Sequence, residues 1–346
     1  MRAFLRKIWM LFAGERERND YVVQYTKYFF ALIFGRKNWI RAKWPGGQQQ
    51  SSKHIAVFVH FDPQGIVHEF VLHYLGELAK ADRRIIFISN SPKFPKTERA
   101  KLQGKVETIL WRRNKGYDFG AYADGIKFVT GRTDIDMDSL LLCNDSVYGP
   151  VYPLQPLLAK MSAKEADMWA LTDSWDTRYH LQSYFLLFHK KVLDHKFFAK
   201  RWKKYVHVQS KSWVIRKHEI GLTAEVRKAN LTTKSLFRYR DLLSDFIEQM
   251  EDSKILTNER IPAGHRNILG QIFEQAQKGS PLNSSHFFWD QLLLSGYPFI
   301  KREVLQGNPM GLPSLYKWEQ LLKEISSYDT ELINDHLETV MRGRFM

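Results

Sequence analysis

Hydrophobic residues in the middle of the chain form short continuous runs, and the stretches between these runs have helical spacing. Four runs predict buried strands, at residues 55–60 (IAVFVH), 84–89 (RIIFIS), 106–111 and 139–143 (SLLLC). Residues 67–80 and 118–130 have the apolar spacing of helices. Continuous apolar strands separated by helices are typical of a parallel sheet that is covered on both faces. The pattern therefore predicts an α/β fold with a mostly parallel, Rossmann-like sheet flanked by helices.

Both ends of the chain differ from this central pattern. A polar stretch, PGGQQQSS at 45–52, is the clearest boundary and predicts a linker. Residues 315–325 have the spacing of an amphipathic helix, and 329–341 predict another. We therefore expect four parts, which are a helical segment at 1–44, a linker at 45–53, the α/β domain at 54–310 and C-terminal helices packed on that domain at 311–346.

The composition narrows the class of protein. With 346 residues, of which 44% are hydrophobic and 14% aromatic, the chain can bury a large core and is not mostly disordered. Its one cysteine, Cys143, excludes a disulfide framework and any zinc site built from several thiolates, and it favours a reducing compartment. A net charge of +15 indicates an anionic partner, which can be nucleic acid, anionic lipid or a phosphorylated substrate.

The positive charge is concentrated in two segments. Residues 1–44 hold ten Lys or Arg against three acidic residues, and residues 190–217 hold ten against one, so the rest of the chain is nearly neutral. In the first segment the basic residues stand among Trp and Phe. Its longest apolar run, 28–34, is far shorter than the roughly 20 residues that a membrane span needs. We expect this segment to lie on an anionic membrane surface as a peripheral helix, and the alternative is a helical hairpin packed on the main domain.

Motifs of several enzyme classes are absent from the sequence. The chain has no GxxxxGK[ST], GxGxxG, HExxH or GxSxG motif, which argues against NTPases, dinucleotide-dependent enzymes, metalloproteases and α/β hydrolases. Polar residues at strand ends are the remaining candidates, because ligands of open parallel sheets bind at the carboxyl ends of the strands.

Two polar clusters follow predicted strands. In RRNKGYDFGAY (112–122), glycines let the backbone pass close to a ligand, and Asn114 and Asp118 can bond a ribose or a base; alternatively, Asp118 is only a helix N-cap. In LLLCNDSVYGP (140–150), Asp145 comes directly after a strand and can offer a hard oxygen ligand to Mg²⁺ or Mn²⁺; alternatively, it only forms a turn.

Three further clusters place polar residues beside apolar runs. The hydrogen-bonding residues between 169 and 188 suit a hydroxyl-rich ligand, and they are Asp173, His180, Gln182 and Ser183. Alternatively, a single histidine such as His180 is more often part of a core. Glu219 in KHEIGLT is either functional or an exposed glutamate at a helix start. Lys301 and Arg302, after a buried run, can meet a diphosphate or can be surface residues.

In combination, these clusters resemble the rhamnan synthesis protein F family of glycosyltransferases. The resemblance is carried by RRNKGYDFGAYADG, LLLCNDSVYGPV, YHLQSYFLLF, VIRKHEIGLT and PLNSSHFFWDQLL with YPFIKREVLQGNP, which follow the family's order over about residues 54–310. It implies a GT-A type fold and transfer of a sugar, typically from dTDP-rhamnose, to a growing cell-surface polysaccharide of the rhamnan or O-antigen type. Together with the basic and aromatic segment 1–44, it leads us to expect a lipid-linked or polysaccharide acceptor, other polysaccharide-assembly enzymes as partners, and a place on the cytoplasmic face of a bacterial membrane.

The resemblance also implies roles for individual residues. Asp145, in the Asn144–Ser146 block, stands where GT-A enzymes hold Mg²⁺ or Mn²⁺ and the donor diphosphate, although Asn144 departs from the usual Asp-x-Asp. Glu219 stands about where inverting enzymes carry the base, and Asp173 is the reserve candidate for this role. The remaining donor-binding candidates are Asn114, Gly116, Tyr117, Asp118, Asn144, His180, Gln182, Ser183 and Lys301. An acceptor hydroxyl needs a carboxylate to take its proton, so we expect a one-base, inverting displacement.

Two other classes of protein compete with this interpretation. A nucleic-acid-binding protein is suggested by the charge and the ten tryptophans, above all by the basic and aromatic segment 190–217. No recognised nucleic-acid motif is present and the rest of the chain is neutral, so we expect no nucleic-acid partner. A non-catalytic scaffold of a polysaccharide-assembly complex is the other alternative.

Overall fold

The computed structural model describes residues 38–49, 51–252, 255–259 and 261–345, together with isolated positions between 23 and 32. Most of the segment 1–44 that we expect on a membrane therefore lies outside the described residues. Residues 40–45, which we expect to end the helical segment and begin the linker, form a strand instead, β1 (Ile40–Pro45). This strand pairs antiparallel with β4 (Thr108–Arg112). The chain after it is docked, since the side-chain amide of Gln48 bonds the carbonyl of Arg83 (2.9 Å) and the N–H of Ile85 (2.9 Å).

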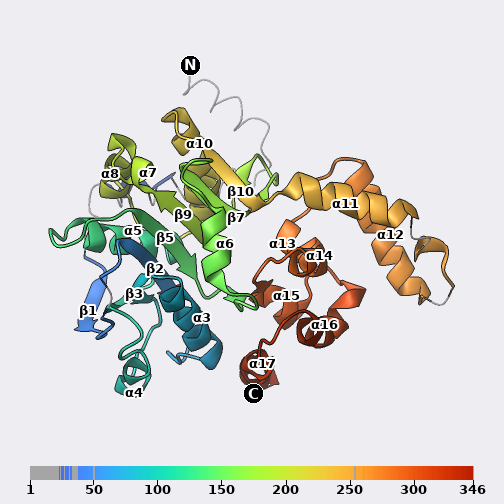
Figure 1. Cartoon of the computed structure of the whole chain (residues 1–346), viewed down its shortest axis with the longest axis horizontal. Coiled ribbons are helices and arrows are strands. Elements are labelled where there is room, and N and C mark those ends of the chain that lie inside the picture. Colours follow the sequence, from blue (N-terminus) through green and yellow to red (C-terminus); the bar gives the residue numbers. More distant parts are fainter. Residues whose placement is uncertain are drawn as a thin grey trace.

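The centre of the molecule is a mixed sheet in which all four predicted strands are present (Figure 1). These strands are β2 (His54–His60), β3 (Arg84–Ser89), β4 and β5 (Ser139–Asn144). They form a parallel block in the order β4-β3-β2-β5. Strand β9 (Phe185–His189) continues the sheet antiparallel to β5, followed by β7 (Met168–Ser174) and its parallel neighbour β10 (Thr233–Phe237), while the short β8 (His180–Leu181) pairs with β7.

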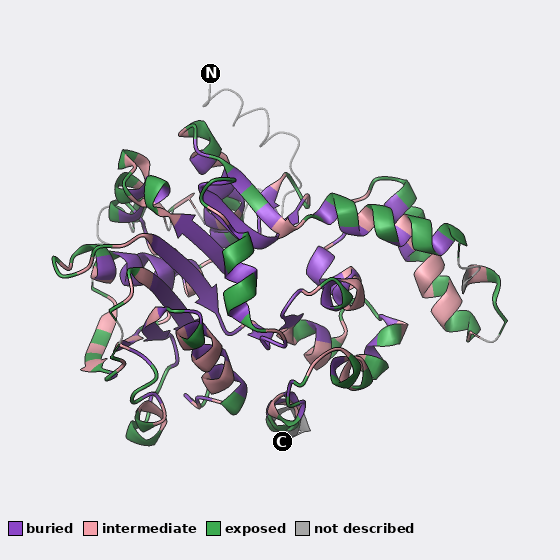
Figure 2. Cartoon of the chain, viewed as in Figure 1, coloured by how far each residue is buried: buried purple, intermediate pink, exposed green. Residues whose placement is uncertain are grey.

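Two hydrophobic cores cover the two faces of this sheet, because successive residues of a strand point to opposite sides. Ala56 and Phe58 of β2 face one core together with α3 (Glu69–Lys80) and α6 (Leu154–Lys160). Ile55 and Val57 face the other core, which contains α5 (Tyr117–Thr130), α8 (Lys196–Lys203) and α10 (Ile220–Lys228). The sheet is buried on both faces (Figure 2), so the expected α/β fold with a mostly parallel sheet is confirmed.

Short elements connect these layers. They are α4 (Lys96–Ala100), β6 (Val147–Tyr148), α7 (Lys190–Leu193), α9 (Lys211–Val214) and η1 (Ile215–Glu219), the last of which is a π-helix that leads directly into α10. No helix in the described part of the chain is both long and apolar enough to cross a membrane.

The C-terminal third is helical and joins the first of the two cores. Two long helices, α11 (Tyr239–Asp252) and α12 (Ala263–Gln277), extend away from the sheet with the short η2 (Ile255–Thr257) between them (Figure 1). The others are α13 (Ser284–Phe287), α14 (Trp289–Leu294), β11 (Ile300–Lys301), α15 (Arg302–Gly307), η3 (Pro313–Lys317), α16 (Trp318–Ile325) and α17 (Glu331–Phe345). The amphipathic helices predicted at 315–325 and 329–341 correspond to η3–α16 and α17, which bury Leu322 and Ile333 completely.

Candidate active site

The polar end of β5 connects two charged groups. Asn144 ends this strand, and its side-chain Nδ2 donates to Oδ2 of Asp118 at 3.0 Å. Its Oδ1 accepts from the backbone N–H (3.1 Å) and from the hydroxyl (2.7 Å) of Ser146. Lys301 then donates from Nζ to the same Ser146 hydroxyl at 3.3 Å. One amide side chain therefore links a carboxylate on one side to an ammonium group on the other.

Asp118 lies in the first turn of α5, in the middle of the GYDFG sequence at residues 116–120. The turn needs glycine at 116, because φ there is +78° and a Cβ atom would lie 3.2 Å from both Tyr205 Oη and Gly120 Cα. Gly116 holds the N-cap position and Asp118 lies inside the helix, which excludes the N-cap alternative for Asp118. Burial, followed by the negative charges of Asp145 and Glu219, raises the pKa of Asp118 to about 6.

Glu219 reaches the same region from the end of the π-helix η1. Its Oε1 accepts from the backbone N–H of Ser183 at 3.1 Å and from the Ser183 hydroxyl at 2.7 Å. Tyr122 supports Ser183 in turn, since its hydroxyl donates to the Ser183 carbonyl at 3.1 Å. Within the described part of the chain, Oε2 of Glu219 makes no hydrogen bond, so it can accept a proton from a ligand. π-helical turns are rare and occur often at functional sites.

Lys301 is the cation of this site, and a short strand pair brings it there. Strand β11 pairs antiparallel with β6, which places Lys301 opposite Val147, just after the Asn144–Ser146 turn. Its Nζ lies 3.8 Å from the centre of the Tyr184 ring. Burial lowers the pKa of Lys301 to about 8, while the charges of Glu219, Glu303 and Asp118 act in the opposite direction. Lys301 therefore interacts electrostatically with both Glu219 and Asp118.

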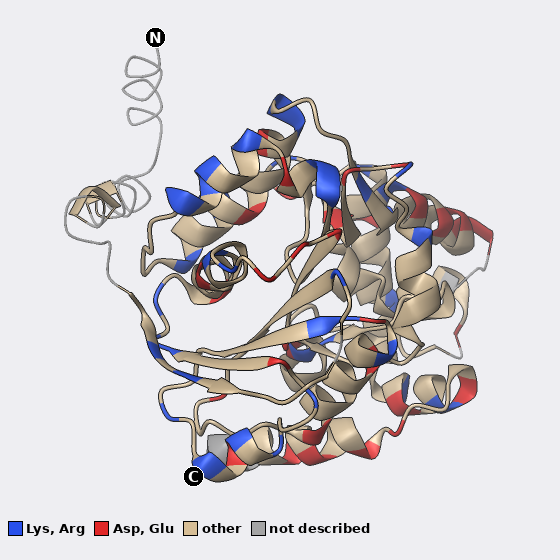
Figure 3. Cartoon of the chain, turned by 60° about the vertical axis from the view of Figure 1, so that its left-hand side comes forward, with Lys and Arg blue, Asp and Glu red and all other residues tan. Residues whose placement is uncertain are grey.

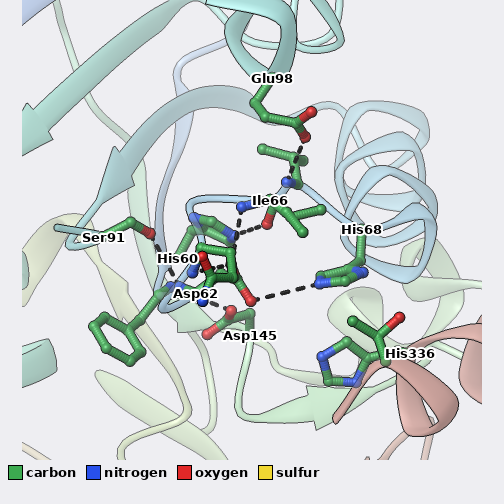
Figure 4. A network of polar contacts seen from close by, with 12 residues as sticks. His60, Asp62, Ile66, His68, Ser91, Glu98, Asp145 and His336 are labelled. Atoms are coloured by element: carbon green, nitrogen blue, oxygen red, sulfur yellow. Dashed lines mark hydrogen bonds and ion pairs between the residues drawn. The ribbon is translucent and has the colours of Figure 1, made fainter. Parts of the chain in front are cut away.

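Asp145, which we expect to bind a metal ion, forms an ion pair with Arg302 instead. Figure 4 shows Asp145 in its polar network, in which His60, Asp62 and His336 are labelled. Its Oδ2 accepts from Nη1 of Arg302 at 3.1 Å and from the N–H of Phe61 at 3.2 Å, and the same Nη1 donates to the Asp145 carbonyl at 2.8 Å. Nη2 of Arg302 lies 3.4 Å from Nε2 of His336 on α17, whose Nδ1 is 2.7 Å from the Tyr148 hydroxyl.

This donor set does not fit a divalent cation. A guanidinium group already neutralises Asp145 at the position where a metal ion would have to compete for the same oxygen. Among the described residues, no three His, Cys, Asp or Glu side chains are grouped so that they could hold a metal ion. The positive charge near the expected diphosphate position is therefore supplied by Arg302 and Lys301.

The structure places the other candidates outside this cluster. Asp173 is the next-to-last residue of β7, and its Oδ1 accepts a hydrogen bond from the N–H of Tyr239 at the start of α11 (2.7 Å). Asp173 lines a separate cavity of about 630 Å³, and burial raises its pKa. His180 lies 2.9 Å from the carbonyl of Arg178 through Nδ1. Gln182 accepts from the Thr172 hydroxyl through Oε1. All three polar groups thus bond to neighbouring protein atoms.

The glycine-rich turn before α5 holds the last candidates. The N–H of Gly116 donates to Oε1 of Gln209 at 3.1 Å, and Tyr117 adopts an unusual positive φ of 53°. The side-chain Oδ1 of Asn114 is buried and has no hydrogen-bond partner in the part of the chain that the structure describes.

Comparison with known proteins identifies the family. Residues 85–280, more than half of the chain, match the rhamnan synthesis protein F family. The chain belongs to this family. The family is described as rhamnan synthesis protein F, so its description names the synthesis of a polysaccharide.

Two relatives show how far the similarity extends. Virulence protein VirA of Vibrio anguillarum is 33% identical over 217 residues, which cover 61% of this chain and 66% of that protein. The uncharacterized protein y4gN of Sinorhizobium fredii is 30% identical over 204 residues, which cover 58% of this chain and 52% of that protein. The chain thus spans less than two thirds of the length of these relatives.

Three solved structures, two of which are sugar transferases by their titles, are similar to this chain at low identity. The galactosyltransferase LgtC with donor and acceptor sugar analogues is 12% identical with a TM-score of 0.35, and the match covers 81% of this chain and 99% of that one. S. aureus TarS 1–349 is 12% identical with a TM-score of 0.34, and the match covers 84% of this chain and 92% of that one. The mannosyltransferase PcManGT of Pyrobaculum calidifontis with GDP-Man and Mn²⁺ is 9% identical with a TM-score of 0.31, and the match covers 92% of this chain and 88% of that one.

The rhamnan synthesis protein F match contains Asp118, Asp145 and Glu219 but ends before Lys301 and His336. The supporting roles of Tyr122, Tyr184 and His336 were not predicted from the sequence. Tyr122 lies in RRNKGYDFGAYADG and Tyr184 in YHLQSYFLLF, but a tyrosine in an apolar run has the pattern of a core residue. His336 lies on an ordinary amphipathic helix and had no signal at all.

Proposed function

We propose that this chain transfers a sugar, with rhamnose as the expected sugar, from a nucleotide donor to a growing cell-surface polysaccharide. The observation that carries this proposal is the position of Glu219, which Ser183 holds through one oxygen while Asp118 and Lys301 interact with it electrostatically. A carboxylate with one free oxygen beside a cation provides the two functions that glycosyl transfer needs. Membership of the rhamnan synthesis protein F family supports the same conclusion.

In the proposed reaction, Oε2 of Glu219 takes the proton of the acceptor hydroxyl as that oxygen attacks the anomeric carbon. The bond between the anomeric carbon and the donor phosphate breaks in the same step, so the configuration inverts. Lys301 and Arg302 stabilise the negative charge that develops on the leaving nucleoside diphosphate. No step needs a divalent cation, because Arg302 already pairs with Asp145. Asp173 remains the reserve candidate for the base.

The nucleotide part of the donor is proposed to bind at the turn before α5. Asn114 supports this assignment, since its buried Oδ1 has no partner among the described residues and can accept from a base or a ribose hydroxyl. Gly116, Tyr117 and Asp118 continue the same turn. The acceptor is proposed to be lipid-linked and the chain peripheral on the inner face of the bacterial membrane, beside other polysaccharide-assembly enzymes, because residues 1–44 combine basic and aromatic side chains.

A panel of nucleotide sugars tests the proposal. Thermal unfolding is measured with dTDP-rhamnose and with UDP- and GDP-sugars, each with Mn²⁺ and with EDTA; the donor that binds raises the melting temperature. Transfer from that donor is then followed as nucleoside diphosphate release, and NMR gives the anomeric configuration of the product. We expect one selective donor and an inverted product. Absence of diphosphate release with every donor and acceptor would contradict a glycosyltransferase, and a retained configuration would contradict the one-step mechanism.

A further inference from the structure

A second polar site lies on the other side of η1 from Glu219. A cavity of about 610 Å³ opens between α8 and the segment formed by η1 and α10, and this volume is in the range of small-molecule sites. Five lysines line it, and they are Lys196, Lys200, Lys204, Lys217 and Lys228. Figure 3 shows Lys and Arg positions repeated along the helices at the upper left of the body of the molecule.

Within the described residues, acidic side chains do not balance the positive charge of this cavity. Its one acidic lining residue, Glu225, is already paired with Arg201. Within the described residues, none of the five lysines forms an ion pair. Like charges grouped in one hollow repel one another, and a bound anion removes this repulsion.

Unpartnered polar atoms are also buried in the wall of the cavity. Tyr205 and His218 are each only 8% exposed, and both line the cavity. Neither ring nitrogen of His218 has a hydrogen-bond partner in the described part of the chain. The Tyr205 hydroxyl is also without a partner there, but it lies beside Gly116, at the turn before α5. A buried donor without a partner is unfavourable, so a ligand with acceptor oxygens is favoured here. The two rings lie 4.5 Å apart and form one surface.

Apolar side chains complete the lining. Phe197, Val206 and Ala229 lie in the same cavity as the lysines and the two unpartnered rings. A free inorganic anion would use only the lysines and the hydrogen-bonding groups. A ligand that joins a charged phosphate to a hydrocarbon chain would use both halves of the lining.

We propose that this cavity binds the phosphate headgroup of an anionic lipid, with the lysines and His218 around the phosphate and the apolar residues against the lipid chain. The site is distinct from the proposed donor site, because its lining includes none of Asp118, Asn144, Glu219 or Lys301. It does not depend on the chain being a glycosyltransferase.

Calorimetric titration of the full chain tests this site with three probes. They are dihexanoyl phosphatidic acid, dihexanoyl phosphatidylcholine and inorganic phosphate. We expect the first to bind at least about 10-fold more tightly than either of the others, since only it supplies both a dianionic phosphate and acyl chains. Inorganic phosphate binding as tightly as the lipid would overturn the lipid assignment, and equal binding of phosphatidylcholine would overturn the role of the lysines.

Matched variants locate the binding. Lys200→Gln combined with Lys217→Gln removes two exposed cavity lysines, and Lys105→Gln combined with Lys164→Gln removes two exposed lysines elsewhere. We expect the first pair to weaken phosphatidic acid binding about 10-fold or more and the control pair less than about 2-fold. His218→Phe, which keeps an aromatic ring and removes both nitrogens, is expected to weaken it about 3-fold or more. Equal losses in the two lysine pairs would show nonspecific charge attraction and overturn the proposal. Donor binding measured on the same variants distinguishes this result from a failure of the proposed function.

Discussion

Among the described residues, charged groups are paired on one side of the π-helix η1 and unpaired on the other, although the central residues of the two sides, Glu219 and His218, are neighbours in the sequence. On the Glu219 side, each charged group has a partner, since Ser183 bonds Glu219, Asn144 bonds Asp118 and Arg302 pairs with Asp145. On the His218 side, five lysines surround a cavity whose single acid is already paired.

The difference follows from exposure to water. Charges taken out of water must be paired or hydrogen-bonded, which is why the half-buried carboxylates and Lys301 are matched within the protein. The cavity lysines are exposed, and water solvates them at little cost. The first arrangement is therefore preorganised for chemistry, while the second one gains most from an external anion. Four predictions, ordered from the largest expected effect to the smallest, test this contrast.

The largest effect is expected from Glu219→Gln. The amide cannot take the acceptor proton, so the transfer rate should fall about 100-fold or more, while the donor dissociation constant stays within about 2-fold. Nucleoside diphosphate release and donor titration give the two values. Asp173→Asn is the matched control, since Asp173 bonds the N–H of Tyr239 and should leave the rate largely intact. The opposite pattern in the two variants would make Asp173 the base.

Lys301→Gln should weaken donor binding about 10-fold or more, because a charge-assisted hydrogen bond is lost. The pH dependence gives a second readout. Because burial lowers the pKa of Lys301 to about 8, its ammonium is charged below pH 8 and loses its proton above it. Donor affinity should therefore be highest below pH 8 and fall as the pH rises through 8. Lys301→Arg should remove this fall, since Arg stays charged; an unchanged pH profile in that variant would exclude Lys301 as the titrating group.

The salt dependence of ligand binding is expected to differ between the two sides of η1. Raising NaCl from 50 to 500 mM should weaken phosphatidic acid binding about 5-fold or more, because the cavity lysines are exposed and screened. Donor binding, in which Lys301 is largely desolvated, should change by about 2-fold or less. Both values come from titrations at two salt concentrations. Equal salt dependence at the two sites would contradict the contrast drawn above.

The smallest effect is expected from metal removal. EDTA should change donor affinity and transfer rate by less than about 2-fold, because Arg302 rather than a cation neutralises Asp145. A large loss that Mn²⁺ restores would show that a metal ion displaces Arg302 from Asp145 when the donor is bound.

Much of the fold was predictable because it is encoded locally. The apolar runs that became β2, β3, β4 and β5 need only their own side chains to be recognised as buried strands. The position of β9 between β5 and β7, antiparallel to both, was not predictable, because pairing partners depend on distant segments. For the same reason, β1 was mistaken for the end of a helical segment.

The candidate site shows the same division between local and distant information. Asn144 and Asp145 stand at the end of a predicted strand, which is where ligands of parallel sheets bind, and the sequence nominated them on that basis. The ion pair of Asp145 with Arg302, 157 positions further along the chain, depends on the pairing of β11 with β6. The sequence near Asp145 therefore could not show that a guanidinium group occupies the expected metal position. Likewise, no local signal tells that the N–H of Tyr239 is bonded to Asp173.

The contact of His336 with Tyr148 and Arg302 has a consequence for biosynthesis. Tyr148 and His336 are 188 positions apart, and at about 5–20 residues per second the ribosome needs roughly 10–40 s to make the chain between them. In the later part of that time, after residue 237, the sheet and Glu219 are already made, but Arg302 and then α17 are still missing. The nascent chain therefore holds Asp145 without its guanidinium partner, and the site is completed only when the last helix has left the ribosome.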